Sequence, residues 1–160
     1  MSDEGKVPET GQWCRTTSGE TTLTTFTWTV EDFGSRQEKT GKAMYSSTFL
    51  AKKPNKKDSM WQLMLFPKGE KEGTNLAIFL KNKNEFQMKA KFRVSILDSN
   101  LRRSKSWESD INWFEAMKSP KDSWGTNKWT LTLRETLLTN KDLLPGGHLS
   151  IYCELTVYGT

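Results

Sequence analysis

The chain of 160 residues, with a formal net charge of +5, is long enough for one domain with a substantial apolar core. No segment approaches the roughly 18 consecutive apolar residues of a membrane helix, and the polar N-terminus with its acidic residues does not resemble a secretory signal. Acidic residues are interspersed among the basic ones, so the positive charge indicates a solvated surface more than a nucleic-acid or acidic partner.

The first predicted strand follows a polar segment. Residues 1–21 are rich in Gly, Ser, Thr and Glu and carry little apolar surface, so we expect a flexible tail before a single domain over residues 22–160. Phe26, Trp28 and Val30 then alternate with threonines, which is typical of a half-buried strand with the threonines facing outward.

A predicted hairpin leads into a central strand. Residues 42–50 form the next predicted strand, and the basic segment 52–57 is a turn-like connection that contains proline. Residues 61–66 carry apolar side chains on both faces, as central strands covered from both sides do. Pro67 and Gly69 end this strand, because proline removes a backbone donor and glycine allows a turn.

Two further strands are predicted in the middle of the chain. Residues 76–80 alternate, but Phe79 points away from the core face and lies beside Lys81, which is unusual for a large aromatic side chain. Residues 89–97 alternate as well, and Phe92 lies on their apolar face.

The C-terminal half has weaker signals and one strong strand. Residues 101–107 are a possible sixth strand, residues 110–118 a short helix capped by its aspartate, and residues 133–138 show a short helical spacing. Residues 144–147 are a turn, and residues 148–158 alternate along the whole segment. These elements predict an all-β fold, an antiparallel β-sandwich of about eight strands with one or two short helices.

The residues offer little for catalysis. The single histidine, His148, has no identifiable partner, and Cys153 falls on the inward face of the last strand. Two cysteines are too few for a disulfide framework or a zinc site, which favours a reduced intracellular setting. No glycine-rich loop joins a strand to a helix. We therefore expect no enzyme, no catalytic residue, no metal site and no cofactor.

Several aromatic residues stand where a core does not need them. Phe79 lies on a polar face, and Trp113 and Phe114 are adjacent in the expected helix, so both cannot point at the core. Trp124 and Gly125 lie in a predicted polar loop, where a tryptophan beside a glycine suits peptide capture. The alternative, that Trp124 folds back onto the sandwich, stays open on these grounds.

A series of short motifs adds a family resemblance. In chain order they are Phe26-x-Trp28-x-Val30 with Phe33, Ser46-Ser47-Thr48-Phe49, Trp61-x-Leu63 ending in Pro67-Lys68-Gly69, Ala90-Lys91-Phe92 through Ser95-Ile96-Leu97, Trp124-Gly125, Lys128-Trp129, Leu143-Leu144-Pro145 and the segment from Leu149 to Val157. Together they resemble the MATH domain (meprin and TRAF homology), and they are most similar to the substrate-binding domain of speckle-type POZ proteins.

The resemblance implies a peptide site on the sandwich. In that family a shallow groove binds a short extended peptide, rich in serine and threonine after an apolar residue. Carried over to this chain, the aromatic wall of the groove consists of Phe79, Phe92, Trp113 and Trp124, and Gly125 gives access to the backbone.

The polar part of the groove departs from the family. After the Trp-Gly pair the family commonly has an aromatic residue and a lysine, whereas this chain has Thr126 and Asn127. Ser123 also separates Asp122 from Trp124. These four residues occupy the positions of the family's polar clamp.

The resemblance also implies a role in substrate selection. Family members of this type usually carry a BTB/POZ domain that dimerises and recruits a cullin-type ubiquitin ligase, and they act in the nucleus or cytoplasm. We therefore expect a non-catalytic, monomeric domain that binds substrate proteins through Ser/Thr-rich peptides. Alternatives are the docking domain of a deubiquitinase or TRAF-type signalling adaptor, and a nucleic-acid-binding sandwich with the basic footprint Lys52, Lys53, Lys56, Lys57, Arg102, Arg103 and Lys105.

Overall fold

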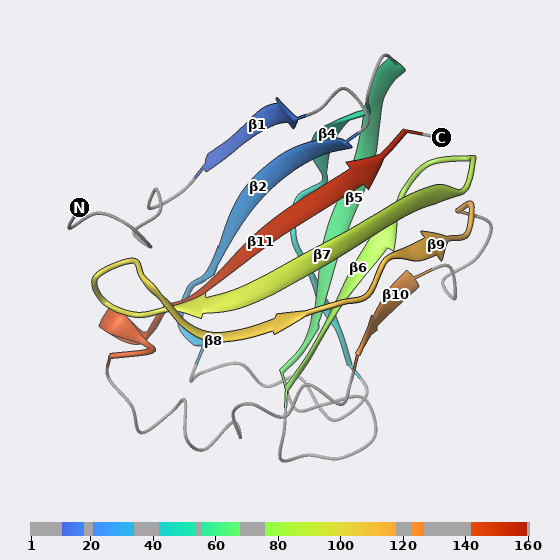
Figure 1. Cartoon of the computed structure of the whole chain (residues 1–160). Helices are drawn as coiled ribbons and strands as arrows, with labels where there is room; N and C mark the ends of the chain where they lie inside the picture. Colours follow the sequence, from blue (N-terminus) through green and yellow to red (C-terminus); the bar gives the residue numbers. More distant parts are fainter. Residues whose placement is uncertain are drawn as a thin grey trace.

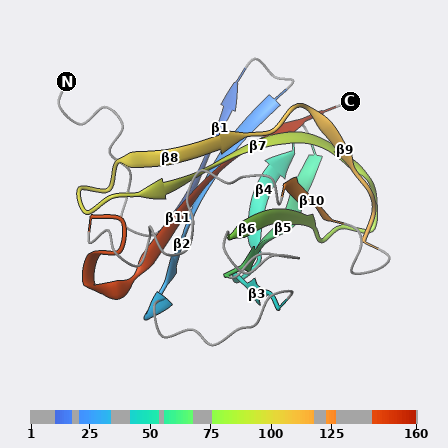
Figure 2. The same ribbon diagram turned by 90° about the horizontal axis from the view of Figure 1, so that it is seen from below.

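The computed structural model describes residues 11–17, 21–33, 42–53, 56–67, 76–117, 123–126 and 142–159, with side chains in these ranges except at residues 11–17, 53, 56–57 and 123–126. Within them the chain folds as two antiparallel β-sheets that pack face to face (Figures 1 and 2). The antiparallel β-sandwich predicted from the alternating segments is confirmed.

The two sheets share out the strands as follows. The six-stranded sheet has the order β1 (Gly11–Thr17), β2 (Thr21–Val30), β11 (Leu149–Tyr158), β7 (Met88–Leu97) and β8 (Arg103–Glu108), and β9 (Asn112–Phe114) also pairs with β7. The five-stranded sheet has the order β10 (Ser123–Thr126), β6 (Ala77–Asn82), β5 (Lys56–Phe66) and β3 (Met44–Tyr45), and β4 (Phe49–Lys53) also pairs with β5.

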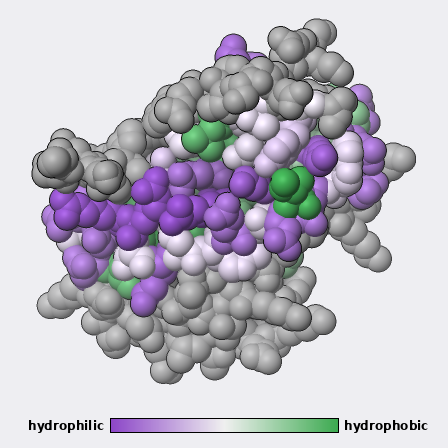
Figure 3. All heavy atoms as spheres, viewed as in Figure 1, coloured by the Kyte–Doolittle hydropathy of each residue, from purple (hydrophilic) through white to green (hydrophobic). Residues whose placement is uncertain are grey.

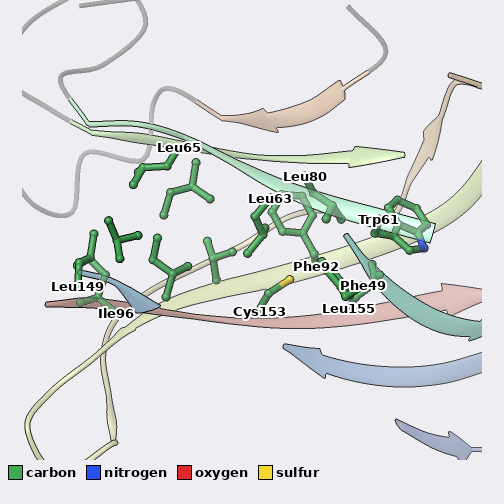
Figure 4. Close-up of a cluster of buried hydrophobic side chains, with 14 of the residues drawn as sticks. Phe49, Trp61, Leu63, Leu65, Leu80, Phe92, Ile96, Leu149, Cys153 and Leu155 are labelled. Carbon is green, nitrogen blue, oxygen red and sulfur yellow. The ribbon is translucent and has the colours of Figure 1, made fainter. Parts of the chain in front are cut away.

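The main core lies between the sheets. The inward positions of β5 and β11 are fully buried, namely Trp61, Leu63, Leu65, Leu149, Ile151, Cys153, Leu155 and Val157. Figure 4 shows side chains of both sheets meeting in this layer. The predicted alternation of the last strand, the central place of β5 and the hairpin between β4 and β5 are therefore confirmed.

The expected helix over residues 110–118 is wrong, because residues 112–114 form strand β9. Lys89 of β7 is opposite Trp113, and Met88 is opposite Phe114. Phe114 is 2 % exposed, whereas Trp113 is 47 % exposed. A strand places adjacent side chains on opposite faces, so it accommodates two neighbouring aromatic residues of which only one enters the core.

Strand β1 lies in the segment that we expected to be a tail. Its seven residues pair with β2, from Gly11 opposite Thr27 to Thr17 opposite Thr21. The expectation of a structureless tail is therefore wrong for residues 11–17. An edge strand can be held by backbone hydrogen bonds to its neighbour, so it needs no apolar periodicity of its own.

The predicted turn before β11 is confirmed. Residues Pro145–Gly147 form a short 3₁₀ turn. Gly146 and Gly147 have φ angles of 66° and 83°, which glycine adopts at little cost. The helical spacing predicted over residues 133–138 lies outside the described residues.

Candidate functional site

The outer face of the five-stranded sheet carries a second apolar cluster. On β5, Met64 and Phe66 face away from the main core, and together with Ala77 of β6 they form a separate buried cluster. The partly buried Phe79 packs against it, with its ring centroid 5.6 Å from that of Phe66 and the two rings nearly perpendicular. The outer face of an antiparallel sheet is commonly polar, so this cluster marks the face as a candidate binding surface.

One row of residues crosses this face from strand to strand. Tyr45 of β3 is opposite Met64, Met64 is opposite Phe79, and Phe79 is opposite Gly125 of β10. We call these four residues the aromatic row. Tyr45 is 53 % exposed, and the Lys81 Nζ lies 5.8 Å from the centroid of its ring, a cation–π contact. The row thus combines exposed aromatic surface with a glycine that lets another backbone come close, and Lys81 adds a cation beside it.

Strand β10 stands where the sequence predicted a loop, and that expectation is wrong for residues 123–126. Its register places Ser123 opposite Lys81, Trp124 opposite Leu80, Gly125 opposite Phe79 and Thr126 opposite Ile78. The side chains of this strand lie outside the described residues, as do Asp122 and Asn127 altogether. The structure therefore brings the backbone of the Trp-Gly pair beside Phe79 through strand pairing.

Two other predicted site residues lie elsewhere. Phe92 is 1 % exposed and lies between the sheets (Figure 4). Its ring packs against those of Trp107 and Phe114, with centroids 5.6 and 6.3 Å away. We expected Phe92 on the wall of a groove. The structure corrects this expectation, because the side chain belongs to the main core. Trp113 is exposed, but it belongs to the six-stranded sheet, where the Lys89 Nζ lies 6.0 Å from its ring centroid.

A buried asparagine ties the two sheets together at the end of β6. Asn82 is fully buried, and its Nδ2 donates to three carbonyl oxygens at 3.0–3.2 Å, those of Phe86, Phe114 and Glu115. Its Oδ1 accepts from the backbone N–H and the Nδ2 of Asn84, at 2.8 and 2.7 Å. Because Phe114 and Glu115 belong to β9 and its C-terminal end, this amide links the strand that carries Phe79 to the strand that carries Trp113.

Among the described residues, the histidine and the cysteine show no catalytic arrangement. The His148 Nδ1 accepts a weak hydrogen bond from the Asp32 backbone N–H at 3.4 Å. Burial raises the pKa of the Cys153 thiol, so this thiol stays protonated and inert at neutral pH. In the described ranges, no three His, Cys, Asp or Glu side chains gather as metal ligands would, and no helix has the length and apolar character to cross a membrane.

Comparison with protein-family profiles agrees with this geometry. The profile of the MATH domain matches residues 25–155, which include β3 to β10 and most of β2 and β11. MATH domains are in general non-catalytic modules that bind other proteins. Because the match spans most of the sequence and the fold is an antiparallel β-sandwich, the chain belongs to the MATH domain family.

Proposed function

We propose that this domain binds short extended peptides of partner proteins at the aromatic row. The observation that carries the proposal is the position of Phe79, a partly exposed aromatic side chain on the outer face of its sheet, directly opposite Gly125. A peptide that covers Phe79 would remove apolar surface from water, which is the main source of affinity at such sites.

Strand β10 supplies the second part of the proposed recognition. It is the terminal strand of the five-stranded sheet among the described residues. A terminal strand has backbone donors and acceptors on one side without a strand partner, so an extended peptide can pair with it while its side chains enter neighbouring pockets. Gly125, at the middle of β10, keeps the approach to Phe79 open.

We further propose that the preferred peptides are rich in serine and threonine after an apolar residue. The support is the resemblance to the substrate-binding domain of speckle-type POZ proteins, together with the polar residues Asp122, Ser123, Thr126 and Asn127 around the Trp-Gly pair. In this proposal Phe79 contacts the apolar residue, and polar residues around Gly125 bind the hydroxyl groups.

The same resemblance supports a role for the whole protein. We propose that this domain selects substrates for a cullin-type ubiquitin ligase in the nucleus or cytoplasm, and that the isolated domain is a monomer without catalytic activity. In this role modest affinity for many short peptides is useful, because a second domain that dimerises would multiply weak contacts through effective concentration.

The experiment combines a peptide array with one matched pair of variants. Arrayed segments rich in serine and threonine are probed with the wild-type domain, and the best binder is then titrated against Phe79→Ala and Phe86→Ala. Phe86 is an aromatic residue 47 % exposed in the bend after β6 and is not part of the aromatic row, so it controls for the loss of exposed aromatic surface. Phe79→Ala should weaken binding by about 2 kcal/mol, whereas Phe86→Ala should bind as wild type does. Equal affinity of the two variants would contradict the proposal.

A further inference from the structure

The outer face of the six-stranded sheet holds a shallow depression unrelated to the aromatic row. Its volume is about 170 Å³, and residues of four neighbouring strands line it, among them Leu23, Lys91, Arg93, Glu108, Glu154 and Thr156. Figure 3 shows this side of the molecule, with hydrophilic side chains gathered in a band across it. The depression combines an apolar and a hydroxyl group, from Leu23 and Thr156, with four charged side chains.

The cations on this face form a column along β7. Lys89, Lys91 and Arg93 occupy every second position, and each is opposite a residue of the outer face of β11, from Tyr158 to Glu154. Alternate residues of a strand lie roughly 6.6–7 Å apart. An extended peptide has the same repeat on each of its own faces, so its alternate side chains can meet all three cations in register.

The carboxylates of this face leave part of that positive charge unneutralised. Arg103 binds Glu154 through two parallel hydrogen bonds, each 3.1 Å long, and this contact raises the pKa of Arg103. The Arg93 Nε lies 4.0 Å from the same carboxylate, so two guanidinium groups share a single negative charge. Arg93 is therefore available to a second anion.

The other two cations are also accessible to a ligand. Lys91 lies 3.6 Å from Glu108, with side chains that are 36 % and 53 % exposed, and such surface pairs contribute little and exchange readily. Lys89 is in no ion pair of the described residues, and its Nζ lies 5.9–6.0 Å from the ring centroids of Tyr158 and Trp113.

We propose that this column, Lys89, Lys91 and Arg93, is a second binding site that takes an extended acidic segment of a partner protein with Asp or Glu at alternate positions. The chemistry is charge complementarity: four cations, including Arg103, stand on this face against Glu108 and Glu154. The backbone of the segment lies over Leu23 and Thr156 in the depression, while the residues between the acidic ones face solvent. The two carboxylates interrupt the positive surface, which favours separate anions of a peptide over the continuous phosphate backbone of a nucleic acid.

The test uses a labelled peptide of about eight residues in which Asp alternates with Thr. A control peptide of the same composition has its Asp residues grouped together. The alternating peptide should bind more tightly, and its affinity should fall several-fold between about 50 and 300 mM salt because the contacts are ionic. The double variant Lys89→Gln with Arg93→Gln should weaken binding about tenfold. Lys52→Gln, an exposed lysine on the other sheet, should leave it unchanged.

The outcomes separate this proposal from the others. Equal binding of the two peptides, or equal affinity of the double variant and Lys52→Gln with urea midpoints that show both to be folded, would overturn it. A single-stranded oligothymidylate is tested in the same way. If it bound the wild type more tightly than the acidic peptide does, and the double variant no longer bound it, the ligand of this site would be a nucleic acid and the proposal would be overturned. Phe79→Ala should not change binding of the acidic peptide, so this site and the aromatic row can fail independently.

Discussion

Replacing Asn82 with alanine should strongly destabilise the domain. The side chain is fully buried and takes part in five hydrogen bonds that join β6 to the end of β9. Alanine would leave the carbonyl of Phe114 and the amide groups of Asn84 without these partners, and those bonds are buried. A buried polar group that loses its partner costs about 1–3 kcal/mol, so two or more such groups give an expected loss of roughly 3–5 kcal/mol.

The measurement is urea unfolding of Asn82→Ala beside a matched variant, Asn112→Ala. Asn112 lies on β9, and its Nδ2 donates to the Asp110 carbonyl at 2.8 Å in an exposed hydrogen bond. Water can replace that bond, so this change should cost less than about 0.5 kcal/mol. If Asn82→Ala unfolds within about 1 kcal/mol of the wild type, the inferred link between the two sheets does not carry the stability assigned to it.

Three further predictions concern the core, its one described thiol and the edge. Leu155→Ala, at a fully buried position of β11, should lower the free energy of unfolding by about 2–5 kcal/mol in urea, and a loss below about 1 kcal/mol would contradict the core assignment. Burial raises the pKa of Cys153 above its ordinary value of 9.0, so the unfolded thiol ionises first, and stability should fall by up to about 1.4 kcal/mol per unit as pH rises above 9. Cys153→Ala should flatten that slope; an unchanged slope would assign the pH dependence to other groups. Deleting residues 1–20 should lower the urea midpoint more than deleting residues 1–10, because only the longer deletion removes β1, and equal midpoints would show that β1 adds nothing.

Alternation of apolar residues predicted the interior of the sandwich well. The segments that became β7 and β11 keep a period of two residues over most of their length, and β5 is apolar on both faces as its sequence indicated. That pattern is imposed by burial on both sides of the core, so it is visible without knowledge of the partners. The same reasoning identified Phe79 as a residue on the wrong face for the main core, and the structure places it in the second cluster.

Short strands at the edges could not be predicted in the same way. The three residues of β9 have no period of their own, and their strand conformation follows from pairing with Met88, Lys89 and Ala90 of β7. Strands β1 and β10 likewise depend on a neighbour, β2 and β6 respectively. Local propensity carries little information where pairing with a distant segment decides the conformation.

Only part of the candidate site could be predicted from the sequence, because pairing between distant segments decides which residues lie side by side. Phe92 shares its alternating face with Val94 and Ile96, and this signal, which indicates a core position, proved to be the better guide than the family resemblance. Tyr45 joins the aromatic row through the pairing of β3 with β5, which the sequence does not show. Asn82 gave no signal, because a single polar residue at a strand end is common and its five hydrogen bonds join distant segments.

The most direct test of the central claim is to locate the bound peptide. Backbone amide shifts of the domain should be followed by NMR during titration with the best serine- and threonine-rich peptide. The largest changes are expected along β6 and β10, around Phe79 and Gly125, with small changes along β2 and β11. Changes confined to the outer face of β7 and β11, or saturable binding without changes in β6 and β10, would contradict peptide recognition at the aromatic row.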